Sequence, residues 1–262
     1  MDQTLDLNLL QLAAILGAGV IAGFINTLAG GGSLLTIPAL LFAGLPSTVA
    51  NATNRVAVVM QSAAGAARFR QRGVFTLRES APMLLPAFVG SVAGALIAAE
   101  IDPRVFDIVL GIVLLLMLAT LFFRPADVTG DADDASGSDR SRIRRPLLTV
   151  ASFFAIGFYG GFVQAGVGFL LIVGIQGLFG FDLVKTNALK LLVVALYSVF
   201  ALGIFAFYGQ VLWLHGVVLG LGNVAGALIG VRFAMRRGTA AIRWVIVAAV
   251  VLTALKLFGV VG

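Results

Sequence analysis

The chain has 262 residues, of which 60% are hydrophobic and 11% are charged, and its formal net charge is +6. Soluble domains are about half apolar and a quarter charged, so this composition excludes a soluble globular protein and predicts an integral membrane protein. The basic residues gather in a few loops between apolar stretches, where they indicate topology, and we expect no nucleic acid partner. The absence of cysteine excludes disulfides, thiolate metal sites and cysteine nucleophiles.

The first half of the chain reads as a series of apolar segments. Leu7–Leu28 is long enough to cross a bilayer, which takes about 20 residues of helix. Gly30–Gly32 must break or loosen that helix, because glycine is about 1 kcal/mol worse than alanine at a helical position. Leu34–Leu45 is too short to cross alone, so we expect a half-helix or part of a re-entrant hairpin. Longer apolar segments follow at 46–67, 82–99 and 105–123.

A polar segment divides the chain into two parts. Residues 124–146 are rich in glycine, serine and aspartate and end in arginines, which is typical of a flexible linker. The predicted organisation is a first transmembrane repeat at 1–123, a cytoplasmic linker at 124–146 and a second transmembrane repeat at 147–262. The second part reads as apolar segments at 147–164, 170–181, 183–208, 212–231 and 241–258.

The second part repeats features of the first in the same order. The hexapeptide Val92–Ile97 recurs unchanged as Val224–Ile229, with a glycine two residues before each copy. The Gly-x-x-x-Gly spacing at 19–23 returns at 157–161, and the Asn-Ala pair at 51 returns at 187. Ordered matches of this kind indicate an internal duplication.

Arginine-rich loops predict how the two repeats are oriented. They lie at 68–78, 124–146 and 232–243, and the positive-inside rule places all three in the cytoplasm. Each half then crosses the membrane an odd number of times, so the halves have opposite orientations and both termini lie outside. We predict an all-α polytopic membrane protein with two inverted-topology repeats, each of about four to five helical segments including a broken or re-entrant short segment.

Polar side chains interrupt the apolar pattern at equivalent places in the two repeats. Asn51, Asn54 and Arg55 share one helix face at i, i+3 and i+4, and Asn187 and Lys190 are spaced i, i+3. A charge at the bilayer centre costs about 3 kcal/mol, so it normally faces a cavity or a partner. The alternative is that both cations lie at the interface and extend toward water. We predict a substrate site formed by Asn26, Asn51, Asn54, Arg55, Gln61, Gln164, Asn187, Lys190 and Tyr197.

These residue types favour an anion as ligand. Cations and amides supply donors, and helix ends at glycine breaks expose N–H groups that attract negative charge. The apolar segments contain no carboxylate cluster for Na⁺, and we expect no metal and no cofactor. Asp182 is interpreted either as a helix cap or as a proton-coupling group. Backbone donors or hinges are predicted at Gly30, Gly31, Gly32, Gly166 and Gly168.

The glycine break and the polar helix after it also resemble a known family. Gly23–Pro38, followed by Ala50–Arg55, is similar to the TauE/SafE family of sulfite and sulfonate exporters. Lys185–Lys190 and Gly222–Gly226 resemble other recurring stretches of that family. The resemblance implies a multi-pass transporter of the bacterial inner membrane that handles small sulfur-containing anions, often outward.

The sequence therefore predicts a secondary transporter that works by alternating access. Its expected partners are a small anion, the lipid bilayer, protons as a coupling ion, and a second copy in a homodimer. We expect no enzymatic activity, because HExxH, GxSxG and Walker patterns are missing. A gated anion channel, a membrane-embedded enzyme and a structural subunit of a larger assembly are the alternatives left open.

Overall fold

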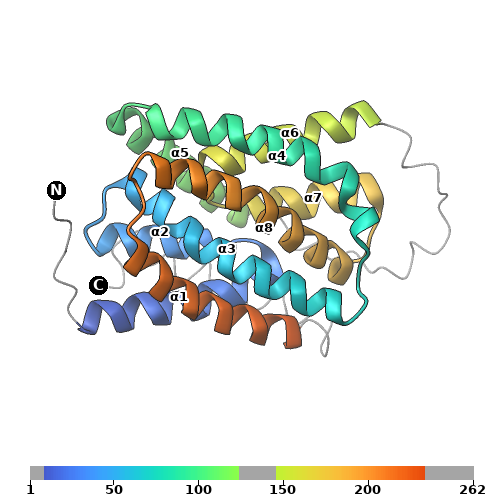
Figure 1. The fold of residues 1–262 in the computed structure, drawn as a ribbon, viewed down its shortest axis with the longest axis horizontal. Helices are drawn as coiled ribbons and strands as arrows, with labels where there is room; N and C mark the ends of the chain where they lie inside the picture. Colours follow the sequence, from blue (N-terminus) through green and yellow to red (C-terminus); the bar gives the residue numbers. More distant parts are fainter. Residues whose placement is uncertain (1–8, 124–145, 234–262) are drawn as a thin grey trace.

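The computed structural model describes residues 9–123 and 146–233, and these residues fold into helices joined by short turns. Several of the consecutive helices lie side by side (Figure 1). The predicted segment at 241–258, most of the linker and both chain termini lie outside the described residues. The helices are α1 (Leu9–Ala29), α2 (Ser33–Phe42), α3 (Ser47–Gln71), α4 (Leu77–Glu100), α5 (Pro103–Phe123), α6 (Pro146–Phe162), α7 (Val167–Phe179), α8 (Leu183–Phe207) and the helix Trp213–Phe233.

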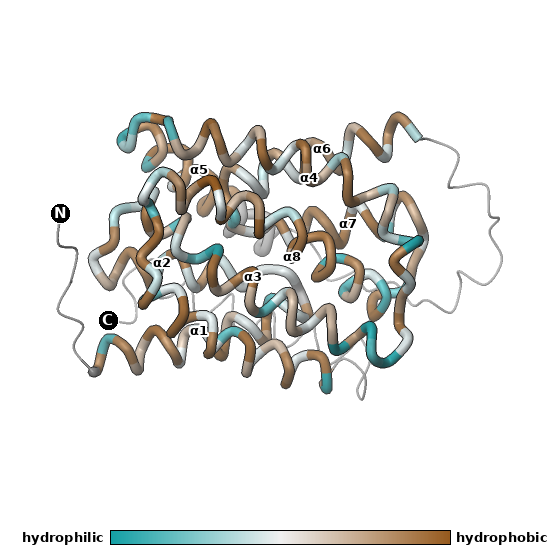
Figure 2. Tube along the Cα trace, viewed as in Figure 1, coloured by the Kyte–Doolittle hydropathy of each residue, from teal (hydrophilic) through white to brown (hydrophobic). Residues whose placement is uncertain are grey.

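Among the described helices, four are long and apolar enough to cross a membrane. They are Leu10–Leu28 within α1, α4, α8 and Trp213–Phe233. Figure 2 shows hydrophobic residues along most of the helices, with hydrophilic ones at several helix ends and along α3. The described residues therefore form an all-helical membrane protein, as the composition predicts, and buried polar residues lie on the long helices α3 and α8.

The short helix α2 turns back against α1 instead of continuing its direction. Ile15 in the first turns of α1 belongs to the same buried cluster as Leu40 and Leu45, which lie at the far end of α2 and just beyond it. The turn is tight at Gly32, where an added Cβ would lie 2.4 Å from the carbonyl oxygen of Ala22. The segment after the glycine break thus forms the second arm of a hairpin.

The second half builds the same kind of hairpin from α6 and α7. The Phe153 and Phe179 rings, near the start of α6 and at the end of α7, are 6.2 Å apart. Gly166 begins α7 with a φ of +71°, a left-handed conformation that favours glycine. The two hairpin tips touch, because an added Cβ at Gly30 would lie 2.4 Å from the backbone carbon of Gly168.

Glycine contacts hold each hairpin against a long helix of the other half. An added Cβ at Gly90 or Gly94 of α4 would lie 2.1 or 2.0 Å from a carbonyl oxygen of α6. At the repeat-equivalent positions Gly222 and Gly226, an added Cβ would lie 2.3 or 1.9 Å from a carbonyl oxygen of α1. Backbones can approach this closely only through residues without a side chain.

These contacts fix the directions of the helices. Gly90 and Gly94 face Phe154 and Phe158 in the same order, so α4 and α6 run parallel, and the same holds for α1 and Trp213–Phe233. In Figure 1 α4 and α6 lie along one edge, α1 and the last described helix along the other, and α3 and α8 cross the middle. The hairpin α1–α2 therefore begins at one end of the molecule, and α6–α7 begins at the opposite end.

Polar contacts join α4 and α8 at both of these ends. Lys185 Nζ lies 2.5 Å from a carboxylate oxygen of Glu79 at the end where α4 and α8 begin. At the other end the Tyr208 hydroxyl donates to the Glu100 carboxylate, and this interaction raises the pKa of Tyr208. Because α4 and α8 belong to different halves, both ends of the molecule have a polar contact between the halves.

Candidate functional site

The side chains predicted for the site are buried in the middle of the molecule. Arg55 is 0% exposed and Lys190 is 1% exposed, so the alternative that they extend toward water at the interface is wrong. Both lie well inside their helices, α3 and α8. The other predicted side chains are buried as well, namely Asn26, Asn51, Asn54, Gln61, Gln164, Asn187 and Tyr197.

Arg55 binds the C-terminal end of α6, a helix of the other half of the chain. Its Nη1 donates to the carbonyl oxygen of Gly160 at 3.0 Å and to Oε1 of Gln164 at 3.3 Å. Its Nη2 donates to the carbonyl oxygen of Gly161, and its guanidinium lies 4.7 Å from the centre of the Phe205 ring. The last carbonyls of a helix lack intrahelical partners and carry partial negative charge, so a cation stabilises this broken end.

Lys190 has the matching role on α8 and binds the C-terminal end of α1. Its Nζ donates to the carbonyl oxygens of Asn26 at 2.7 Å and Thr27 at 3.4 Å, and to Oδ1 of Asn187 at 2.8 Å. Asn187 in turn donates from Nδ2 to the carbonyl oxygen of Leu28 at 3.1 Å. Each half therefore supplies the cation that binds the broken helix of the other half.

Amide side chains form further hydrogen bonds at the C-terminal end of α6. Asn51 donates from Nδ2 to the carbonyl oxygen of Phe162 at 3.0 Å and accepts from the backbone N–H of Gln164 at 3.2 Å. Gln164 then donates from Nε2 to the Tyr197 hydroxyl at 3.3 Å. Arg55, Gln164 and Tyr197 thus form one connected polar network between α3, α6 and α8.

Asn54 differs from its neighbours on α3 because it acts within its own half. Its Oδ1 accepts from the Thr36 hydroxyl at 2.6 Å, and its Nδ2 donates to the Ser33 hydroxyl at 3.4 Å. Both partners lie on α2, so Asn54 holds the hairpin arm against α3. A contact of Asn54 with substrate stays a prediction.

Arg55 and Lys190 do not form one cluster. The Arg55 guanidinium lies beside the Phe205 ring of α8. Further along α3, an added Cβ at Gly65 would lie 2.7 Å from Leu191, which follows Lys190 in the sequence of α8. Arg55 and Gly65 are ten residues apart, which is about 15 Å of helix. The two cations therefore lie at the two ends of a central segment of the α3–α8 pair.

Unpartnered polar groups occur within this central segment. Gln61 and Ser62 lie between Arg55 and Gly65 on α3, and Ser198 lies between Lys190 and Phe205 on α8. All three side chains are 0% exposed. Within the described chain, the Gln61 amide, the Ser62 and Ser198 hydroxyls and Arg55 Nε have no hydrogen-bond partner. Buried polar groups are normally hydrogen-bonded, so this set is unusual, and a contact of Gln61 with substrate stays a prediction.

The family of the chain follows from comparison with known proteins. The family model described as "Sulfite exporter TauE/SafE" matches residues 15–257. The chain belongs to this family. "Probable membrane transporter protein ORF9" of Sinorhizobium sp is 34% identical to it, covering 96% of this chain and 94% of that protein. "Probable membrane transporter protein" of Haemophilus influenzae is 30% identical, covering 93% and 92%.

A third relative has the same kind of name. "Probable membrane transporter protein YfcA" of Escherichia coli strain K12 is 32% identical, covering 91% of this chain and 86% of that protein. No solved structure matched the chain. This member of the TauE/SafE family is therefore a multi-pass membrane transporter, and the names of the family and of its relatives describe transporters and not enzymes.

Asp182 of this TauE/SafE protein begins α8 as its N-cap. Its side chain is exposed and accepts from the backbone N–H of Lys185 at 2.9 Å. This is the helix-cap interpretation of the two given above. A proton-coupling role for Asp182 stays a prediction.

The glycines of the two breaks are closely packed. An added Cβ at Gly31 would lie 2.8 Å from the Phe169 ring, so the tip of one hairpin is also covered by the other. Gly166 accepts from the backbone N–H of Phe169 at 3.0 Å. The close packing explains why glycine is needed at the breaks. Roles for Gly30, Gly31, Gly32, Gly166 and Gly168 as hinges or substrate donors stay predictions.

Two polar residues of the helix Trp213–Phe233 were not predicted as site residues. His215 is 3% exposed, and Asn223 is 2% exposed, with its backbone packed against Gly23 of α1. His215 Nε2 and Asn223 Oδ1 have no hydrogen-bond partner among the described residues. An isolated histidine and asparagine in an apolar segment carry little sequence signal. In the described part of the chain, no group of three histidine, cysteine, aspartate or glutamate side chains could hold a metal.

Proposed function

We propose that this TauE/SafE transporter is a secondary transporter that exports small sulfur-containing anions, such as sulfite or organosulfonates. The observation that carries the proposal is the central segment between Arg55 and Lys190. It has a buried cation at each end, and buried Gln61 and Ser62 without partners lie between them. Hydroxyl and amide donors flanked by positive charge suit an oxyanion, which has only acceptors to offer.

The charge of the site supports an anionic substrate. Among residues 9–123 and 146–233, the salt bridge is the one between Lys185 and Glu79. Neither Arg55 nor Lys190 therefore pairs with a carboxylate of these residues. Each cation instead faces a helix C-terminus, whose partial charge is about −0.5. The buried site thus keeps a positive excess that an anion would neutralise. A sulfite ion needs no metal or cofactor for such binding.

Transport by alternating access is supported by the way in which the halves interlock. The glycine contacts of α4 with α6 return at repeat-equivalent residues between Trp213–Phe233 and α1. The two hairpins begin at opposite ends of the molecule, as inverted repeats require. Inverted repeats with broken helices around a central site are the usual architecture for rocking one half against the other.

The proposed orientation places the arginine-bearing end in the cytoplasm of a bacterium, with the inner membrane as location. Arg68 and Arg72 at the end of α3 and Arg232 at the end of the last described helix line the same pocket, so two of the basic loops lie at one end. The same end contains the start of α6, because α6 runs parallel to α4. The positive-inside rule then assigns this end to the cytoplasm.

A flux assay tests the proposal. Purified protein in liposomes loaded with ³⁵S-sulfite is expected to give saturable efflux, which Arg55→Ala abolishes, whereas the exposed Arg70→Ala leaves it unchanged. Wild-type flux of Arg55→Ala would contradict the site. Flux that rises linearly with sulfite concentration, without saturation, would contradict a transporter and favour the gated channel.

A further inference from the structure

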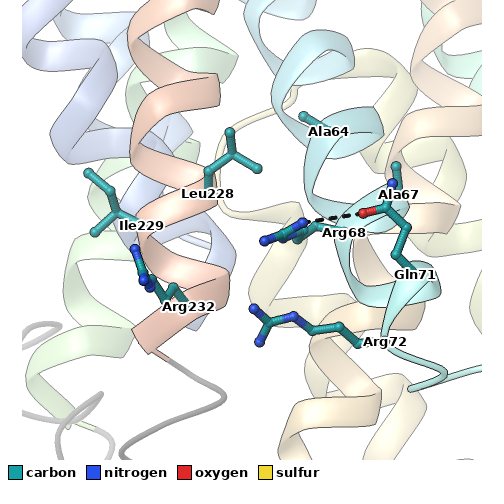
Figure 3. A pocket seen from close by; sticks show the side chains of 8 residues that line it. All are labelled: Ala64, Ala67, Arg68, Gln71, Arg72, Leu228, Ile229 and Arg232. Carbon is teal, nitrogen blue, oxygen red and sulfur yellow. Dashed lines mark hydrogen bonds between the residues drawn. The ribbon is translucent and has the colours of Figure 1, made fainter.

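A second anion site lies outside the central segment. A pocket of about 570 Å³ opens between α3 and the helix Trp213–Phe233, at the arginine-bearing end of the molecule (Figure 3). The two helices belong to different halves of the chain, so the pocket lies across the boundary between the halves. Its lining residues are Ala64, Ala67, Arg68, Gln71, Arg72, Leu228, Ile229 and Arg232.

The pocket is strongly basic. Arg68, Arg72 and Arg232 line it together, and no carboxylate is among the lining residues. Figure 3 shows the side chains of Arg68 and Arg72 extending from α3 toward the helix that carries Arg232. Arg68 donates to Gln71 Oε1 at 3.4 Å, which leaves most guanidinium donors of the pocket without an acidic partner in the described chain.

The rest of the lining is apolar and lies on one side of the arginines. Leu228 and Ile229 are 42% and 55% exposed, and Ala64 and Ala67 form the facing wall on α3. In Figure 3 these four residues lie above Arg72 and Arg232, toward the middle of both helices. A soluble anion would gain nothing from this wall, whereas an amphiphile would contact both parts of the pocket.

We propose that this pocket binds the phosphate headgroup of an anionic phospholipid from the adjacent leaflet. The three guanidinium groups hold the phosphate, and the acyl chains lie along Leu228 and Ile229. Basic pockets between transmembrane helices are the usual recognition sites for anionic lipid headgroups. A lipid in this position contacts both halves of the protein, so its binding stabilises the arrangement of α3 and Trp213–Phe233 described here. The site is independent of the anion that the central segment binds.

Lipid titration of the purified full-length protein tests the proposal. Phosphatidylglycerol, added to protein in phosphatidylcholine micelles, is expected to raise the melting temperature and to appear as a bound adduct in native mass spectrometry. Each arginine near an anionic headgroup contributes about fivefold to binding. The triple variant Arg68→Gln/Arg72→Gln/Arg232→Gln is therefore expected to weaken phosphatidylglycerol binding about 100-fold. The control Arg70→Gln/Arg78→Gln/Arg104→Gln removes the same charge from exposed positions outside the pocket and is expected to bind as wild type does.

The outcomes separate a lipid from other occupants. Equal binding by the pocket variant and the control variant would overturn the proposal. An equal rise in melting temperature with inorganic phosphate alone, present in wild type and lost in the pocket variant, would also overturn it, because the pocket would then hold a soluble anion. If the triple variant does not fold in phosphatidylcholine, Arg232→Gln alone is measured and is expected to weaken binding about fivefold.

Discussion

At the C-terminal ends of α1 and α6, backbone carbonyls are bound by two different cationic side chains, a lysine and an arginine. A lysine ammonium has three donors, and Lys190 uses its ammonium on Asn26, Thr27 and Asn187, so this end is saturated. Arg55 binds three oxygens at the end of α6 and still has Nε without a partner. The comparison indicates that the Lys190 end is structural, whereas the Arg55 end keeps a free donor for substrate.

Replacement of Arg55 should give the largest effect on transport. Arg55→Ala removes a charge and leaves carbonyls of α6 unpartnered, so we expect sulfite efflux to fall at least 100-fold, as the loss of a charged hydrogen bond of about 3 kcal/mol implies. Arg55→Lys keeps the charge but not the bidentate fork, and it should recover part of the flux. Equal flux of Arg55→Ala and Arg55→Lys in liposomes would contradict a role for the positive charge at the Arg55 end.

Lys190 should matter more for stability than for transport. Lys190→Met keeps the apolar length of the side chain but removes the charged donor of the Asn26 and Thr27 carbonyl oxygens and of Asn187 Oδ1, which costs about 1–3 kcal/mol of unfolding free energy. We expect a lower melting temperature in detergent and a less than tenfold loss of efflux per folded molecule. A normal melting temperature with abolished transport would show that Lys190 contacts the anion directly.

These predictions also show what the sequence could and could not provide. The glycine breaks and the polar faces of α3 and α8 were predictable, because they interrupt an apolar pattern at repeat-equivalent positions. The partners of Arg55 and Lys190 could not be predicted, because they include backbone carbonyls of the other half, and a pattern of side chains does not indicate which carbonyls lie nearby. Asn54 shares the periodicity of Asn51, yet tertiary packing turns its amide toward α2.

Other details were out of reach for a similar reason. Spacing grouped Arg55 and Lys190 into one site, and only the antiparallel register of α3 and α8 shows that they lie at two ends of a central segment. His215 was not predicted as a site residue because a single histidine gives no periodic signal, although it is buried. Burial and register depend on which helices become neighbours, and local sequence does not determine that.

The central segment predicts a separate, intermediate effect. Ser62→Ala removes a buried hydroxyl without a partner, so stability should not fall, whereas the KM for sulfite should rise about tenfold through the loss of a charge-assisted hydrogen bond. Ser80→Ala is the matched control, because Ser80 is equally buried but donates to the carbonyl oxygen of Leu77 at 2.7 Å. An unchanged KM for Ser62→Ala would place the substrate outside this segment.

Asp182 should give the smallest effect. Asp182→Asn keeps a good N-cap for α8, so we expect an unchanged melting temperature, and Asp182→Ala should cost about 1 kcal/mol of stability. If Asp182 only begins the helix, the pH dependence of efflux should be the same in wild type and Asp182→Asn. A shifted pH profile of Asp182→Asn at normal stability would instead support proton coupling.

The most direct test of the central claim is the position of a bound anion. Selenite has the shape and charge of sulfite, and its selenium gives anomalous diffraction in crystals of the full-length protein. We predict an anomalous peak in the central segment between Arg55 and Lys190, within hydrogen-bond reach of Gln61 or Ser62. A peak only in the arginine pocket between α3 and Trp213–Phe233, or no peak at a saturating selenite concentration, would contradict the account.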